Sequence, residues 1–283
     1  MNYSEINEIE IKKSIEILKN QVSINKSAEI LKTIFNLMDL TTLSVTDSRE
    51  KVKLMVEKVN NFSKHFPNYH NVAAICVYPA LVETVKKNLT VEDVNIASVG
   101  AGFPASQTFL SIKLAECELV INKGANEVDI VISVGEFLSE NYEKIAWEIS
   151  LLKNIIGENH LKVILETGEL LNLENIYKAS VLSIAAGGDF IKTSTGKSDI
   201  SATPEAVFVM CMAIKKYYEK TGKKIGIKPS GGIKTSEDAV LYYLIVKQIL
   251  GQEWLNNKFF RFGVSSLANN ILSDLENKKI KYF

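Results

Sequence analysis

The chain has 283 residues, of which 46% are hydrophobic, and its 33 basic residues balance its 33 acidic residues. This length suits one large domain or two small ones. A chain without net charge exerts no broad attraction on nucleic acid or membrane lipid, so an anionic ligand would need a local binding site. The three cysteines are far apart, which argues against a zinc site and a disulfide framework.

The first twenty residues mix charged side chains with isoleucines. They contain no apolar core of a signal peptide, and no run in the chain approaches the length of a membrane span. We therefore expect a soluble, cytoplasmic protein with no membrane or nucleic-acid partner.

Two helices are predicted at the start of the chain. Residues 4–20 place isoleucines and a leucine on one stripe, and apolar residues recur at steps of four from Ser27 through Met38. We expect residues 1–36 to form a helical extension that packs on a core domain of residues 37–283.

Within the core domain, short apolar or β-rich runs alternate eight times with amphipathic stretches. The runs lie at 38–43, 73–78, 94–99, 127–133, 163–166, 190–195, 225–229 and 259–263. Such alternation is typical of parallel βα units. Eight units in a chain of this length favour a closed (β/α)8 TIM barrel, with an open doubly wound sheet as the alternative.

Several of the predicted strands carry charges where buried strands should be apolar. Glu127 and Asp129 share one face of the fourth strand, and Lys192 and Lys228 lie in the sixth and seventh. We place all of them near the C-terminal ends of their strands, which is the catalytic end of a barrel. A buried ion pair that only holds the barrel together is the alternative, but two lysines and an aspartate at one end favour a catalytic role.

These residue types indicate chemistry through an imine. A lysine must be neutral to attack a carbonyl, and at an ordinary pKa of ~10.4 only about one lysine in 2,500 is neutral at pH 7. Burial beside a second ammonium lowers that pKa. A carboxylate then moves the protons between carbinolamine, imine and enamine. Lys192, Lys228 and Asp129 supply these three parts.

Three turns that contain glycine follow the last three strands and predict a phosphate site. They are Thr195-Gly196-Lys197, Ser230-Gly231-Gly232, and Gly263 with Ser265 and Ser266. Glycine allows close backbone approach, and a helix that begins after serines offers free N–H groups to an anion. Ordinary turn and capping chemistry explains each turn taken alone.

From Met38 to Leu267 the chain resembles the deoxyribose-phosphate aldolase family, a class I aldolase family, and in particular its longer, animal-like branch. The matching segments are MDLTTL, AAICVYP, GFPASQT, GANEVDIVI, KVILETGEL, DFIKTSTGK, ATPEA, GIKPSGG and RFGVSSL. The resemblance implies reversible cleavage of 2-deoxy-D-ribose 5-phosphate to acetaldehyde and D-glyceraldehyde 3-phosphate, within deoxynucleoside catabolism. It implies no cofactor and no metal.

The resemblance also implies roles for single residues. Lys192 forms the imine, Lys228 perturbs its pKa, and Asp129 is the general acid and base. Asp39 would lie near Lys228. Further residues are expected to line the substrate site or to surround the phosphate: Thr41, Cys76, Thr195, Gly196, Lys197, Gly231, Gly232, Gly263, Ser265 and Ser266.

Other residues leave alternatives open. Tyr282, next to last in the chain, either supplies a proton donor from the tail, as a terminal tyrosine does in many family members, or belongs to a disordered end. Glu127 is expected to be structural. Glu166 and Glu169 either shape the pocket or, for Glu169, begin a helix. The three histidines are expected to be isolated surface or loop residues.

Two other functions compete with this interpretation. One is another class I sugar-phosphate aldolase, and the other is a phosphate-binding barrel without catalysis. The expected partners are a sugar phosphate and acetaldehyde. The amphipathic outer helices are compatible with a homodimer, although the sequence defines no interface.

Overall fold

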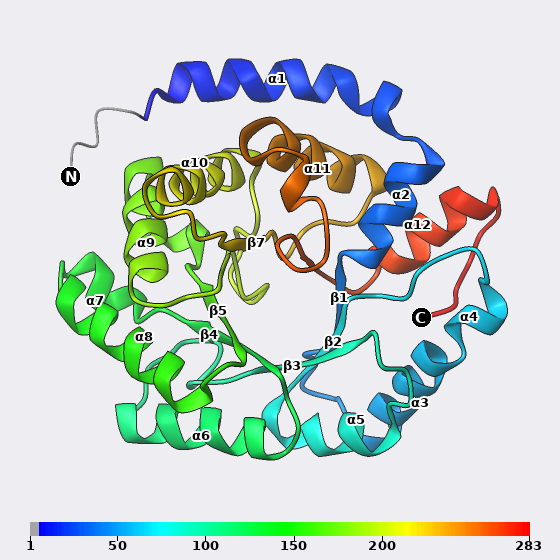
Figure 1. Ribbon diagram of the computed structural model, residues 1–283, viewed down its shortest axis with the longest axis horizontal. Helices are drawn as coiled ribbons and strands as arrows, with labels where there is room; N and C mark the ends of the chain where they lie inside the picture. Colours follow the sequence, from blue (N-terminus) through cyan, green and yellow to red (C-terminus); the bar gives the residue numbers. More distant parts are fainter. Residues whose placement is uncertain (1–5) are drawn as a thin grey trace.

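The computed structural model describes residues 6–283 and forms a (β/α)8 barrel (Figure 1), as the alternating pattern predicts. The strands are β1 (Met38–Thr41), β2 (Ala74–Val77), β3 (Asn95–Val99), β4 (Glu127–Val131), β5 (His160–Ile164), β6 (Phe190–Lys192), β7 (Gly226–Lys228) and β8 (Phe262–Val264). The helices are α1 (Glu8–Asn25), α2 (Ala28–Asn36), α3 (Arg49–Asn60), α4 (Phe62–His65), α5 (Val82–Asn88), α6 (Leu110–Asn122), α7 (Val134–Leu138), α8 (Tyr142–Ile156), α9 (Leu173–Ala185), α10 (Pro204–Thr221), α11 (Ser236–Leu250) and α12 (Leu267–Glu276).

The eight strands pair in parallel, in the order β7-β6-β5-β4-β3-β2-β1-β8. Two parallel bridges, Ile227 to Phe260 and Ser230 to Gly263, join the two ends of this sheet and close the barrel. The helices surround the strands, so most strand residues are buried on both sides. All strands therefore end at one mouth of the barrel.

The ends of several elements differ from the sequence prediction. β1 begins at Met38 as predicted, but it ends at Thr41 and not at Leu43. β5 begins at His160, three residues before the predicted start. Helical periodicity and β propensity overlap in short apolar runs, and tertiary pairing decides where each element stops.

The two N-terminal helices lie against the barrel's outer helices. Ile11, Ile15 and Leu18 are buried on the inner side of α1, which runs across α10 and α11 (Figure 1). Ser27 caps α2 through its hydroxyl. Among residues 6–283, no helix is long and apolar enough to cross a membrane.

Candidate active site

Strand register brings the charged residues of the barrel into adjacent pairs. Lys192 on β6 lies directly beside Lys228 on β7, and Asp129 on β4 lies directly beside Lys162 on β5. Neighbouring strands are ~4.8 Å apart, so the side chains of each pair enter the barrel together. Both Lys192 and Lys228 end their strands, as predicted.

Asp129 is the carboxylate that joins the two catalytic lysines proposed from sequence. Its Oδ2 accepts hydrogen bonds from Lys192 Nζ at 2.8 Å and from Lys228 Nζ at 2.7 Å. Its Oδ1 accepts from Lys162 Nζ at 3.1 Å. All four side chains are buried. The structure therefore brings Lys192, Lys228 and Asp129 together at hydrogen-bonding distance.

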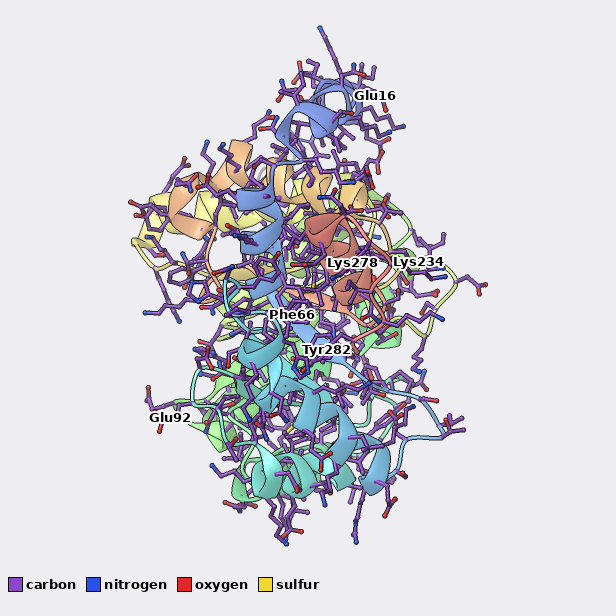
Figure 2. The ribbon with its side chains drawn as sticks, turned by 90° about the vertical axis from the view of Figure 1, so that its right-hand side faces the viewer. Glu16, Phe66, Glu92, Lys234, Lys278 and Tyr282 are labelled. Atoms are coloured by element: carbon purple, nitrogen blue, oxygen red, sulfur yellow. The ribbon has the colours of Figure 1, made fainter. Side chains whose placement is uncertain are left out.

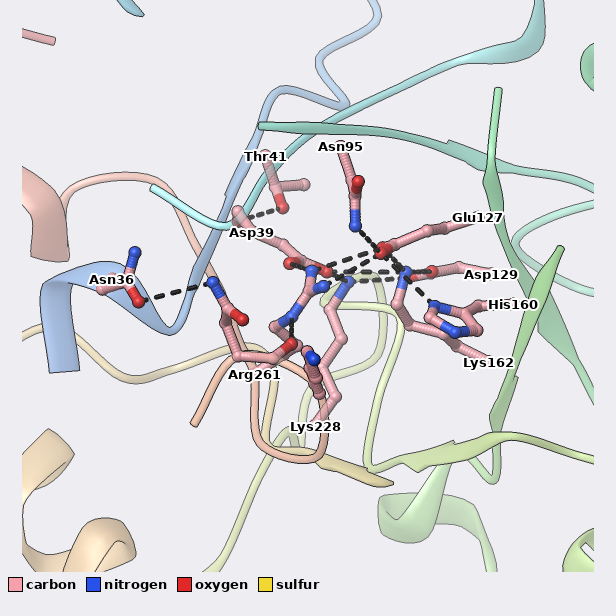
Figure 3. A network of polar contacts seen from close by, with 12 residues as sticks. Asn36, Asp39, Thr41, Asn95, Glu127, Asp129, His160, Lys162, Lys228 and Arg261 are labelled. Atoms are coloured by element: carbon pink, nitrogen blue, oxygen red, sulfur yellow. Dashed lines mark hydrogen bonds and ion pairs between the residues drawn. The ribbon is translucent and has the colours of Figure 1, made fainter. Parts of the chain in front are cut away.

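A deeper layer of charges supports this group (Figure 3). Arg261, just before β8, donates to Asp39 Oδ1 at 2.6 Å and to Glu127 Oε1 at 2.9 Å. Asp39 also accepts from Lys228 Nζ at 2.5 Å, as the resemblance implies. Glu127 forms a close ion pair with Lys162. The whole buried cluster contains four cationic groups and three carboxylates.

Lys192 is the cation of this cluster whose pKa is lowered. Burial raises the free energy of an unpaired charge, and the cluster becomes neutral when one of its four cations gives up a proton. Burial is the largest cause that lowers the pKa of Lys192, and the Lys228 ammonium lowers it further. The pKa of Lys228 is instead raised, because Asp129 and Asp39 outweigh its burial. The cluster thus holds Asp129 ionised, with a pKa well below its usual range, because three lysines surround it.

Glu127 lies elsewhere in its strand than the sequence suggested. It is the first residue of β4, at the N-terminal end, and the prediction that placed it near the C-terminal end is wrong. Asp129 is the third of five residues, so it lies at the middle of β4 and not near its C-terminal end as predicted. Glu127 therefore faces the bottom of the barrel, and its contacts with Arg261 and Lys162 are those of a structural residue.

Sequence reasoning missed three members of this network. Lys162 was placed just outside its strand, and Arg261 was not singled out although it lies in a predicted strand. His160 is not an isolated loop residue, because it begins β5 and its Nδ1 lies 3.6 Å from Glu127 Oε1. Their common signal is an ionisable residue in or next to a buried strand.

Small apolar side chains line the barrel next to this cluster. Cys76, Ala97 and Val99 form a buried group against which Tyr78 and Phe103 pack. Burial raises the pKa of the Cys76 thiol to about 11, and the Asp129 charge adds to this effect. Cys76 therefore stays protonated at neutral pH, which makes it a poor nucleophile, and its role as a lining residue stays a prediction.

The predicted phosphate residues gather around one cavity of about 260 Å³ at the mouth of the barrel. Its lining includes Thr41, Leu43, Thr195, Gly196, Lys197, Ser230, Gly231, Gly232, Ile233, Lys234, Gly263, Val264, Ser265 and Ser266. Ser265 and Ser266 lead into α12, and Ser266 makes no capping hydrogen bond through its side chain. Lys234 adds a second cation that the sequence prediction did not include.

Glycines in this cavity serve two purposes. Gly196, Gly231 and Gly232 have φ near +80°, the left-handed region that favours glycine. At Gly263 the reason is space, since a Cβ atom there would lie 3.2 Å from Lys228 Cε and closer still to Ser230. The loops after β6, β7 and β8 can therefore approach a ligand closely.

A larger cavity of about 530 Å³ lies between α6, α7 and α8. Lys113 and Glu148 line it, and Lys113 Nζ donates to Glu148 Oε2 at 3.1 Å. Neither Lys192 nor Asp129 borders this cavity. They do not line the smaller cavity either, but that cavity is bordered by Thr195 and Ser230, which follow closely after Lys192 at the end of β6 and Lys228 at the end of β7.

The sequence model of the DeoC/LacD family aldolases matches residues 33–271. The chain belongs to this aldolase family. Human deoxyribose-phosphate aldolase is 43% identical over 251 residues, which cover 85% of this chain and 78% of the human protein. A Caenorhabditis elegans protein, provisionally named a deoxyribose-phosphate aldolase, is 43% identical over 268 residues, covering 94% of this chain and 88% of that protein.

Solved structures agree with the family assignment. A structure described as an aldolase, QR15, has a TM-score of 0.71 at 27% identity, with 86% of this chain and 96% of that chain covered. A deoxyribose phosphate aldolase from Aeropyrum pernix, described as tetrameric, has a TM-score of 0.67 at 27% identity and covers 91% of this chain and 96% of its own. Both are similar to this chain over the whole barrel.

The C-terminal tail of this DeoC/LacD aldolase is docked, not disordered. The Tyr282 hydroxyl donates to the Lys58 carbonyl at 2.7 Å, and its ring meets Phe66 edge-on at 5.3 Å (Figure 2). The Asn269 side chain accepts from the backbone N–H groups of Tyr282 and Phe283 at 2.9 Å. Within residues 6–283 these contacts keep Tyr282 on the outer helices, so the structure does not bring it to the buried charged cluster.

Proposed function

We propose that this aldolase cleaves 2-deoxy-D-ribose 5-phosphate reversibly to acetaldehyde and D-glyceraldehyde 3-phosphate through a Schiff base on Lys192, in the breakdown of deoxynucleosides. One observation carries the proposal most directly: Lys192 is a buried amine with a lowered pKa, and its strand leads into a cavity suited to phosphate. The names of the human and nematode relatives support the choice of substrate.

The reaction follows from these positions. Neutral Lys192 attacks C1 of the open-chain aldehyde, and loss of water gives a protonated imine. The bond between C2 and C3 then breaks, its electron pair moves toward the iminium nitrogen, and the C3 hydroxyl loses its proton. Glyceraldehyde 3-phosphate leaves, the enamine takes a proton at C2, and water releases acetaldehyde from Lys192.

Asp129 is our candidate for the proton transfers, because its Oδ2 already accepts a hydrogen bond from Lys192 at 2.8 Å. Lys228 shares that oxygen, and we assign it to the same relay. Thr41 lies in the mouth cavity, where we place the sugar hydroxyls. The turn at Gly196 and Lys197 and the start of α12 hold the phosphate.

The wild-type protein should release glyceraldehyde 3-phosphate from 2-deoxyribose 5-phosphate at least about 100-fold more efficiently than glyceraldehyde from 2-deoxyribose, because charge-assisted phosphate contacts are worth several kcal/mol. A coupled assay that measures kcat/KM for both sugars tests this. Longer ketose phosphates in the same assay separate the proposal from another class I sugar-phosphate aldolase. Turnover of none of these sugars would favour a non-catalytic barrel.

The pH profile of Lys228→Met should show how Lys192 is activated. Only neutral Lys192 attacks, so kcat/KM rises with pH until the pKa of Lys192 is passed. Loss of the Lys228 charge removes one cause that lowers this pKa. It also removes the hydrogen bond by which Lys228 competes with Lys192 for Asp129 Oδ2. The rising limb of the profile should therefore move up by about one pH unit. A limb that stays in place or moves down would show that Lys228 does not tune Lys192.

A further inference from the structure

Glu166 is a buried carboxylate outside the charged cluster. It follows β5, is 5% exposed, and has φ of 55°. This left-handed backbone is unfavourable for a residue with a Cβ atom. A chain keeps such a conformation where the surrounding contacts demand it, and these positions concentrate at functional sites.

The contacts of Glu166 lead directly to the proposed phosphate turn. Its Oε1 accepts from the Thr195 backbone N–H at 3.1 Å, and its Oε2 accepts from the Thr195 hydroxyl at 2.5 Å. Thr195 Oγ1 in turn accepts from the Lys197 backbone N–H at 3.0 Å. Three hydrogen bonds thus run from one carboxylate through Thr195 to Lys197, and both carboxylate oxygens are used.

The loop between β6 and α10, residues 193–203, has no helix or strand of its own, so its shape depends on neighbouring loops. On one side it touches the loop of Glu166, where a Cβ atom on Gly168 would collide with the Ile200 carbonyl. On the other side, a Cβ atom on Gly231 would lie 2.5 Å from Ser201 Oγ. Glu166 supplies the charged contact between the loops after β5 and β6.

Direct phosphate binding by Glu166 is excluded by charge, because two anions repel each other. The contacts of Glu166 with Thr195 instead preorganise the turn. A turn that is already held in shape loses less conformational freedom when the phosphate binds. Thr195 is itself engaged with Glu166 and Lys197, so its hydroxyl shapes the turn, whereas the sequence alone suggested that it surrounds the phosphate.

We propose that Glu166 is a positioning residue that sets the affinity for the phosphate group by fixing the turn from Thr195 to Lys197. This inference deepens the proposed function and rests on it. The role concerns binding of the phosphate and not the imine chemistry at Lys192, so it makes a distinct kinetic prediction.

The test is Glu166→Gln, which keeps the size of the side chain and removes its charge. KM for 2-deoxyribose 5-phosphate should rise about tenfold, the effect of losing one charge-assisted hydrogen bond, with kcat changed less than about twofold. Turnover of unphosphorylated 2-deoxyribose should not change, which also shows that the variant is folded. Glu169→Gln is the matched control, because Glu169 lies in the same loop but is exposed.

A double variant and a binding measurement complete the test. In a Thr195→Val background, Glu166→Gln should raise KM by less than about threefold, because the two residues act as one unit. Calorimetry should show weaker binding of inorganic phosphate to Glu166→Gln, by about tenfold, and this readout needs no turnover. If wild type cleaves neither sugar, the proposed function fails while the phosphate titration still decides the role of Glu166.

Equal loss of activity on both sugars would make Glu166 a general structural residue and overturn the inference. An unchanged KM and an unchanged dissociation constant for inorganic phosphate would overturn it as well.

Discussion

Lys192→Met is expected to abolish aldol cleavage, by roughly four orders of magnitude or more, because the other lysines of the cluster, Lys162 and Lys228, have raised pKa values and stay protonated. The fold should survive. Asp129 keeps hydrogen bonds from Lys162 and Lys228 when Lys192 is replaced, so no carboxylate is left buried without a cation. Removal of the surplus cation also leaves three cations facing three carboxylates. Activity measured beside thermal unfolding tests both statements.

Lys13→Met is the control for this variant, because Lys13 is exposed on α1. It should match wild type in both activity and melting temperature. Measurable cleavage by Lys192→Met above the control for spontaneous reaction would assign the imine to another lysine. A large fall in melting temperature would instead show that the Lys192 charge holds the barrel together.

Arg261→Met is expected to have the largest effect on stability. Arg261 is 2% exposed and binds both Asp39 and Glu127. Its loss leaves two buried carboxylates short of a partner, which costs about 3–5 kcal/mol of the free energy of unfolding. For a chain of this size the melting temperature should fall by about 5–9 °C. Calorimetry measures this change directly.

Arg49→Met is the matched control, since Arg49 is exposed at the start of α3 and surface ion pairs contribute little. Its melting temperature should stay within about 1 °C of wild type. If Arg261→Met were as stable as wild type, the deeper layer of charges would not support the barrel. The position of Asp39 beside Lys228 would then need another cause.

The sequence was informative about the site where a charge interrupts an apolar strand. Asp129, Lys192 and Lys228 stand out in this way because buried strands exclude unpaired charges. Lys162 did not stand out, because the predicted strand began one residue after it. Its partnership with Asp129 depends on register between β4 and β5, which is a tertiary property that no local pattern contains.

The phosphate turns and the tail also combine features that a local sequence pattern predicts with features that depend on tertiary contacts. Glycines after three strands predicted a phosphate site, but the support from Glu166 depends on its left-handed backbone and on the packing of two loops. The tail of five residues carries no periodicity. Its docking depends on Asn269 and on aromatic residues of α4 that are distant in sequence, so no local pattern contains it.

The central claim is that Lys192 forms a covalent imine with the aldehyde. Incubation of the wild-type protein with acetaldehyde and borohydride, followed by peptide mass spectrometry, tests it most directly. We expect an added ethyl group on Lys192, loss of activity in step with labelling, and no label at this site in Lys192→Met. An active protein that carries no adduct on any lysine, or one labelled at Lys228 in place of Lys192, would contradict it.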